Sequence, residues 1–198
     1  MRATLIAVLL AACAAGAVGD APPESRASAP SSPPARLLVE GWGVDNVVVE
    51  RSTAAEVVAE YGEPDEVIKH KKYSREMAYK KLGLSFYYFY EDAEKKIFHI
   101  AAKRPFKGST TKGIVLGEST VADVLRIYGN ASISSNTSYD YWALRYQGVE
   151  FYVENDGPDK EWPSFDGDFQ GRLVTSIGIV KVEEKKAEEE TKEEEAEP

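Results

Sequence analysis

The sequence predicts an α+β fold in which two tandem repeats, each a helix followed by antiparallel strands, share one core. Three observations lead to this prediction. One helical pattern occurs twice along the chain. After each copy, the apolar residues change from helical spacing to the alternation that is typical of strands. Each copy alone is below the size that usually buries a stable core, so we expect one shared core with the helices on one face of the sheet.

The duplicated pattern is Arg51–Glu63, which returns as Glu118–Asn130. Tyr61 aligns with Tyr128, and a glycine follows each tyrosine. Five positions upstream also match without a gap: Ser52 with Ser119, Thr53 with Thr120, Ala55 with Ala122, Glu56 with Asp123 and Val57 with Val124. The duplication predicts a globular domain over 37–182, with repeat one over 44–104 and repeat two over 111–182.

The first copy has the start and stop signals of a helix. Ser52 and Thr53 suit the N-cap, because a hydroxyl oxygen accepts a hydrogen bond from an unpaired backbone N–H, and Glu56 lies near the N3 position of a capping box. Gly62 ends the helix at about Tyr61. The second copy repeats the pattern, with Ser119 as cap, Val121, Val124, Leu125 and Tyr128 as apolar face, and Gly129 as stop.

Strand patterns follow each helix, and a β-branched run, Val47–Val49, precedes the first one. The two sets of strands share a five-position pattern that starts with glycine and ends in Phe-Tyr, Gly83–Tyr87 in the first set and Gly148–Tyr152 in the second. The expected strands are 66–71, 77–81, 84–90 and 97–103 in repeat one, and 139–146, 149–154 and 173–182 in repeat two.

Repeat two carries an insertion in the loop 155–171. Ile100 matches Ile177 at a longer spacing than the one that separates Gly83 from Gly148, which places the extra residues in this loop. Loops of this length are uncommon without a use. The aromatic residues of the loop either fold back over the sheet or form a contact site. The candidate partner-binding residues are therefore Trp162, Phe165 and Phe169 of the loop, with Tyr87 and Phe89 of the aromatic strand 84–90.

The N-terminus has the pattern of an export signal. Residues 1–12 form a short basic start and an apolar run, which is too short for a bilayer span of about 20 apolar residues. The run ends in Leu10-Ala-Ala-Cys13, which resembles the bacterial lipobox. This resemblance implies that Cys13 is lipidated and begins the mature protein, and that Ala14 directs outer-membrane sorting. The alternative is an ordinary secretory signal that is cut near residues 15–19, with Cys13 discarded.

The segments that flank the domain have biased compositions. Residues 13–36 are rich in proline, serine and alanine, which predicts an extended, disordered tether. Residues 183–198 are mostly glutamate and lysine, which predicts a disordered acidic tail. The net charge of −9 argues against a nucleic-acid partner, since phosphate binding needs clustered Lys and Arg. With Cys13 as its one cysteine, the chain can form no intramolecular disulfide.

The sequence shows no constellation of catalytic or metal-binding residues, so we expect a protein that is not an enzyme and has no cofactor or metal. Its two histidines are His70, in a basic run, and His99, which alternates with Phe98 and Ile100 in a strand. Neither lies in a recognisable triad. Residues 166–171 resemble the opening of a calcium loop, but the twelfth position is Ile177 instead of a bidentate glutamate.

A helix that ends in Tyr-Gly and is followed by strands, given twice, resembles the β-lactamase inhibitor protein. One copy is similar to the SmpA/OmlA-type small lipoproteins of the outer-membrane barrel-assembly machinery. The resemblance rests on Ser52–Pro64, Gly83–Tyr87 and residues 116–129. It implies an antiparallel sheet that packs helices on one face, and a protein that works by binding another protein. The single cysteine departs from the disulfide-bearing pattern of the inhibitor.

These observations predict an exported bacterial lipoprotein with a non-catalytic protein-binding domain. We expect it in the outer membrane, facing the periplasm, held through its lipid anchor and bound to an envelope protein. Two alternatives stay open for its role: a structural or assembly component of an outer-membrane complex, and a secreted protein that resembles an enzyme inhibitor. For location, the alternative is a soluble secreted or periplasmic protein.

Overall fold

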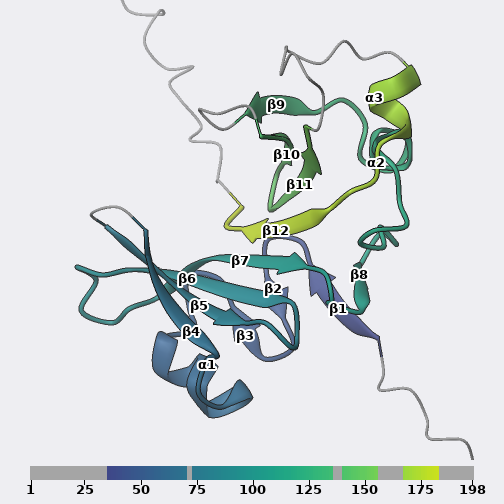
Figure 1. The fold of residues 1–198 in the computed structure, drawn as a ribbon. Coiled ribbons are helices and arrows are strands. Elements are labelled where there is room, and N and C mark those ends of the chain that lie inside the picture. Colours follow the sequence, from purple (N-terminus) through teal and green to yellow (C-terminus); the bar gives the residue numbers. More distant parts are fainter. Residues whose placement is uncertain (1–34, 71–72, 136–139, 156–166, 183–198) are drawn as a thin grey trace, which may run out of the picture. The chain divides into compact units, whose positions relative to one another are not determined.

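Short strands and helices alternate along the part of the chain that the computed structural model describes, residues 35–70, 73–135, 140–155 and 167–182 (Figure 1). The chain divides into two compact units after residue 33, and all of the described residues belong to the second unit. Their fold is mixed α+β with mostly strands, which confirms the predicted class at this level. None of their helices is long and apolar enough to cross a membrane.

The larger of two sheets has eight strands in the order β4-β5-β6-β7-β12-β11-β10-β9, and every neighbouring pair is antiparallel. The two central strands, β7 and β12, join the strands that follow the first helix to those that follow the second. The strands are β4 (Glu66–His70), β5 (Ser74–Tyr79), β6 (Leu84–Phe89), β7 (Ile97–Lys103), β9 (Ser132–Ser135), β10 (Tyr141–Tyr146), β11 (Val149–Glu154) and β12 (Ser176–Val180).

A smaller sheet of four strands has the order β3-β2-β1-β8. In it, β1 (Arg36–Val39) pairs antiparallel with β2 (Gly43–Val44) and parallel with β8 (Gly108–Thr110), while β3 (Val47–Val48) pairs with β2. Because the first helix and the strands β4 to β7 lie between β1 and β8 in the chain, local sequence patterns did not predict this sheet.

The helices α1 (Ala54–Tyr61) and α2 (Val121–Tyr128) begin with complete capping boxes. In α1, the Thr53 side chain accepts a hydrogen bond from the backbone N–H of Glu56, whose carboxylate accepts one from the backbone N–H of Thr53. Thr120 and Asp123 make the same pair of bonds in α2.

The prediction that Ser119 caps α2 is wrong by one residue. Thr120 is the cap, and the Ser119 hydroxyl accepts a bond from the backbone N–H of Val115 at 3.0 Å. Ser52 accepts the equivalent bond from Val48 at 3.0 Å before α1. In both places the serine therefore stabilises the turn that leads into the helix.

Both helices contact the large sheet through the tyrosine of their last turn. The Tyr61 ring lies 5.3 Å from Phe86 of β6, and the Tyr128 ring lies 5.0 Å from Phe151 of β11. A second tyrosine in each half, Tyr79 or Tyr146, donates to the carbonyl of the glycine after the helix, at 2.8 Å in both cases. We call the face of the sheet that these rings contact the core face. Its buried side chains are Met77, Leu84, Phe86, Ile100, Trp142, Leu144, Phe151, Ile177 and Ile179.

The third helix, α3 (Gly167–Gly171), contacts α2 and lies in the loop that was expected to lack regular structure (Figure 1). Strand β9 was also missed, because Ser-Ile-Ser-Ser has weak strand propensity and gains its order by pairing with β10. The predicted signal, the acidic tail and residues 13–34 of the predicted tether lie outside the described residues. The last tether position, Arg36, instead begins β1, because it pairs with Gly108 of β8.

Candidate functional site

The candidate site is the polar face of the large sheet, the side opposite the core face. We define it by Glu76 of β5, Ser85 and Tyr87 of β6, His99 of β7 and Tyr152 of β11. Cross-strand pairing places Glu76 beside Tyr87 and Tyr87 beside His99. Tyr87 and Tyr152 are the equivalent last residues of the pattern that the two sets of strands share.

Glu76 is a buried carboxylate, with only 4% of its surface exposed. Its Oε1 accepts a hydrogen bond from the Ser85 hydroxyl at 2.7 Å, and its Oε2 lies 2.6 Å from Nε2 of His70. Burial alone would raise the pKa of Glu76, but the hydrogen bonds from Ser85 and His70 outweigh it and lower the pKa below its ordinary value. The carboxylate is therefore ionised at neutral pH and fixed in position.

His99 lies at the centre of the polar face, with its ring 5.1 Å from that of Tyr87. Its Nε2 is buried and has no hydrogen-bond partner within the described part of the chain. Burial lowers the pKa of His99, although the charges of Glu150 and Glu76 act in the opposite direction. The ring is consequently neutral at pH 7.

Gly178 of β12 makes room for His99. A Cβ atom at this glycine would lie 2.5 Å from Nε2 of His99 and 3.1 Å from the ring of Tyr152. Real Cβ contacts are not this short, so any side chain at position 178 would displace the imidazole. The close approach of His99 is thus the reason for glycine at position 178. The backbone conformation is not the reason, because the φ of Gly178 does not lie in the left-handed region.

On the second half of the polar face, Tyr152 donates a hydrogen bond to Glu150, which also forms an ion pair with Arg145 at 3.0 Å. The ring of Tyr141 meets that of Tyr152 edge to face, 5.4 Å away. Burial and the neighbouring charge of Glu150 raise the pKa of Tyr152. Its hydroxyl therefore stays protonated and available as a donor at any physiological pH.

Aromatic side chains gather at one end of β5 to β7, and we call Tyr73, Phe89, Tyr90 and Phe98 the aromatic patch. Phe89 and Phe98 stack at 4.2 Å with nearly parallel rings, yet Phe89 is 48% exposed and Tyr90 is 58% exposed. The Tyr90 backbone N–H donates to the Tyr73 carbonyl at 2.8 Å, and the Arg75 guanidinium lies over the Tyr90 ring. A stacked ring that stays half exposed, as Phe89 does, is suited to a contact surface.

A β-bulge brings Phe98 onto the polar face. Tyr87 pairs with His99 but Tyr88 pairs with Ile97, so Phe98 is the extra residue between them. The sequence expectation that His99 faces away from both of its neighbours is therefore wrong for Phe98, whose ring lies 6.5 Å from that of His99 on the same side. A bulge interrupts the period of two on which that expectation depends.

The predicted partner-binding residues have different positions in the structure. Tyr87 lies half-buried on the polar face and Phe89 lies in the aromatic patch. Phe169 is only 4% exposed and belongs to the hydrophobic core, so its assignment to a contact surface is corrected: α3 directs the ring inward. Trp162, Phe165 and the lipidation candidate Cys13 lie outside the described residues.

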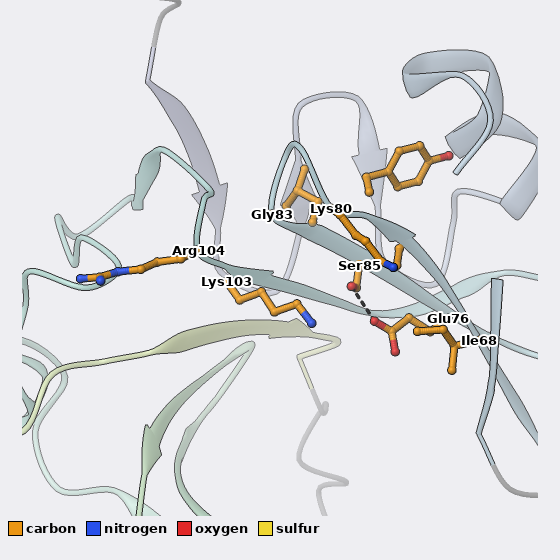
Figure 2. Close-up of a pocket in the computed structure, with 10 residues that line it drawn as sticks. Ile68, Glu76, Lys80, Gly83, Ser85, Lys103 and Arg104 are labelled. Carbon is orange, nitrogen blue, oxygen red and sulfur yellow. Dashed lines mark hydrogen bonds between the residues drawn. The ribbon is translucent and has the colours of Figure 1, made fainter. Parts of the chain in front are cut away.

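A pocket of about 250 Å³ opens on the polar face across β4 to β7 (Figure 2). Glu76 and Ser85 line it, and Ile68 and Ala78 give it apolar walls. Three cationic side chains also line it: Lys80, Lys103 and Arg104. In Figure 2, Lys103 points toward the Ser85–Glu76 pair and Arg104 points away from it.

The described residues include no cluster of three or more His, Cys, Asp or Glu side chains that could hold a metal ion. Asp168, part of the calcium-like run, lies in the first turn of α3. Sequence reasoning missed Glu76, His99 and Gly178 as parts of one site. The strand alternation around Glu76 was a usable signal, whereas the contact of His99 with Gly178 depends on long-range strand pairing.

No protein-family model and no curated protein matches this chain in sequence. The described fold is similar to that of the uncharacterised protein YfeY from Escherichia coli, with a TM-score of 0.51, 13% identity, and coverage of 72% of this chain and 99% of that one. A DUF4309 family protein, YjgB from Bacillus subtilis, gives a TM-score of 0.45 at 15% identity, with coverage of 71% of this chain and 88% of that one. An extracellular protein with an SCP domain from Bacillus anthracis gives a TM-score of 0.37 at 14% identity, with coverage of 69% of this chain and 47% of that one.

At these identities the likeness to YfeY concerns the fold alone. The site must therefore be interpreted from the residues of this chain.

Proposed function

We propose that the chain is an exported bacterial lipoprotein whose folded domain binds a partner protein in the cell envelope and catalyses no reaction. The observation that carries the binding role is the aromatic patch, where Phe89, which is 48% exposed, stacks on Phe98 within the sheet. Rigid aromatic side chains provide much of the binding energy at protein interfaces. Tyr87 extends the same surface toward the centre of the polar face.

The proposal includes an internal duplication, with two tandem copies that share one core and place their helices on one face of the sheet. Three matched features support it: the capping boxes, the tyrosine–glycine helix ends and the rings of Phe86 and Phe151 beneath them. The resemblance to the β-lactamase inhibitor protein and to SmpA/OmlA-type lipoproteins is part of the same proposal. The two copies differ in their exposed aromatic side chains: among the described residues, only the first carries the aromatic patch.

The partner site is tested by photo-crosslinking in the native envelope. A crosslinking amino acid is placed at Phe89 and, as a matched control, at Leu173, which is similarly exposed at 43% but lies outside the patch. We expect one discrete protein adduct from position 89 and none from position 173. Identical adducts from both positions would reject the aromatic patch as the site. A Phe98→Ala exchange should reduce the adduct by removing the ring that stacks on Phe89.

Attachment to the outer membrane is tested separately by metabolic labelling with a palmitate analogue. The wild type should carry the label and a Cys13→Ser variant should not. A wild type without label would favour the secreted or periplasmic alternative. If a shortened tether abolishes function while patch variants have no effect, the role is that of a structural or assembly component.

A further inference from the structure

We propose that the pocket across β4 to β7 binds a small zwitterion, a ligand with one ammonium and one carboxylate group, such as an amino acid or a peptide with two free ends. The pocket brings together one buried acid, one lysine without an ion-pair partner among the described residues, and apolar walls. This site does not depend on the aromatic patch or on lipidation, so it stands apart from the proposed partner binding.

Glu76 is the negative group of the pocket. Its side chain is almost fully buried, and its two oxygens accept hydrogen bonds from Ser85 and from His70, with Tyr87 as a further donor. An ionised carboxylate has about four acceptor positions, so it can still accept bonds from an ammonium group. Desolvated charges interact more strongly than exposed ones, which makes this carboxylate a favourable place for a cationic group.

Lys103 is the positive group. Its side chain forms no hydrogen bond or ion pair with any described residue, whereas Lys80 pairs with Glu66 at 2.7 Å and Arg104 donates to the Gly117 carbonyl at 3.2 Å. Lys103 and Glu76 line one pocket with opposite charges, but no ion pair joins them among the described residues. A ligand with both charges would connect the two side chains, with its carboxylate at Lys103 and its ammonium at Glu76.

The walls and size define the rest of the ligand. Ile68 and Ala78 present apolar surface beside the two charges. A volume of about 250 Å³ lies below the range of about 300–1,000 Å³ that is typical of pockets for drug-sized ligands, so it suits an amino acid or a dipeptide. A simple anion would be repelled by Glu76 and a simple cation by Lys103, whereas a zwitterion can place its ammonium at Glu76 and its carboxylate at Lys103.

The test uses the full chain and amide chemical shifts measured by NMR, with L-alanine and L-alanyl-L-alanine as probes. Two capped dipeptides, N-acetyl-L-alanyl-L-alanine and L-alanyl-L-alaninamide, each lack one charge. We expect saturable shifts at Ala78, Leu84 and Ser85 with the zwitterions, and affinities weaker by about tenfold or more with either capped form, since each loses a charge-assisted hydrogen bond. Binding of alanine assigns the site to free amino acids, and binding of the dipeptide alone assigns it to peptides.

Two variants locate the site. Lys103→Gln should weaken the zwitterion about tenfold, while Lys107→Gln, an exposed lysine outside the pocket, should leave the affinity unchanged. Ser85→Ala tests the acidic end of the pocket if Glu76→Gln does not fold. Three results would each overturn the proposal: no saturable shifts, capped dipeptides that bind as tightly as the zwitterions, or an unchanged zwitterion affinity in Lys103→Gln. Loss of photo-crosslinking at Phe89 would not affect it.

Discussion

Tyr61 and Tyr128 end their helices in the same way, each donating a hydrogen bond from its hydroxyl to a carboxylate of the segment that joins β1 to β3. Tyr61 donates to Asp45 at 2.8 Å, and Tyr128 donates to Glu40. Both rings also contact a cation, Arg36 or Lys112. One short N-terminal segment therefore holds the ends of both helices.

Removing either hydroxyl should destabilise the fold. Tyr61→Phe and Tyr128→Phe should each lower the free energy of unfolding by about 1.5–3 kcal/mol, because each loses a hydrogen bond to a charged group. Chemical denaturation measures the change. Tyr88→Phe is the control, since the Tyr88 hydroxyl has no hydrogen-bond partner in the described part of the chain, and it should change stability by less than about 0.5 kcal/mol. Equal effects of all three exchanges would contradict the assignment.

Gly178→Ala should destabilise the domain by about 1–3 kcal/mol, because the new methyl group would overlap Nε2 of His99. Adding His99→Ala should recover part of this loss, and a double-mutant cycle measures the coupling. Gly171→Ala, where the added Cβ meets open space, is the matched control. If the two glycine variants are equally stable, His99 does not depend on the space above Gly178.

Stability should fall in mild acid through His99. Burial lowers the pKa of His99 in the folded state, so below the ordinary value of about 6.5 the unfolded chain binds the proton more readily. The stabilisation is therefore present above that value and is lost as pH falls toward the lowered pKa. Between pH 7 and pH 5, His99→Gln should lose less free energy of unfolding than the wild type. Parallel pH profiles would show that His99 is not the group responsible.

Truncation of two phenylalanines should lower the free energy of unfolding by very different amounts. Phe169→Ala removes a buried ring and should cost about 3–5 kcal/mol of stability. Phe89→Ala removes a half-exposed ring and should cost less than about 1 kcal/mol. Thermal unfolding of both variants gives the comparison. A stable Phe169→Ala variant would show that α3 does not fix this ring in the core.

Local signals explain what the sequence predicted well. The helix starts and ends came from caps and glycines that act within one turn, and α1 and α2 lie where these signals placed them. The errors have long-range causes. The pairing of β1 with β8, the bulge at Phe98 and the inward turn of Phe169 all depend on contacts that no local pattern specifies. For the site, Tyr87 and Phe89 were predicted from composition, but the pocket required the register of four strands.

The strand order of the large sheet also bears on how the chain folds. Its strands pair with sequence neighbours everywhere except at β7 and β12, where Ile100 pairs with Ile179 and all of β8 to β11 lies between them in the chain. Each half can therefore assemble by hairpins, and most of the entropic cost of loop closure falls on this one junction. Because His99 and Gly178 lie on these two strands, the polar face is completed only when the two halves have joined.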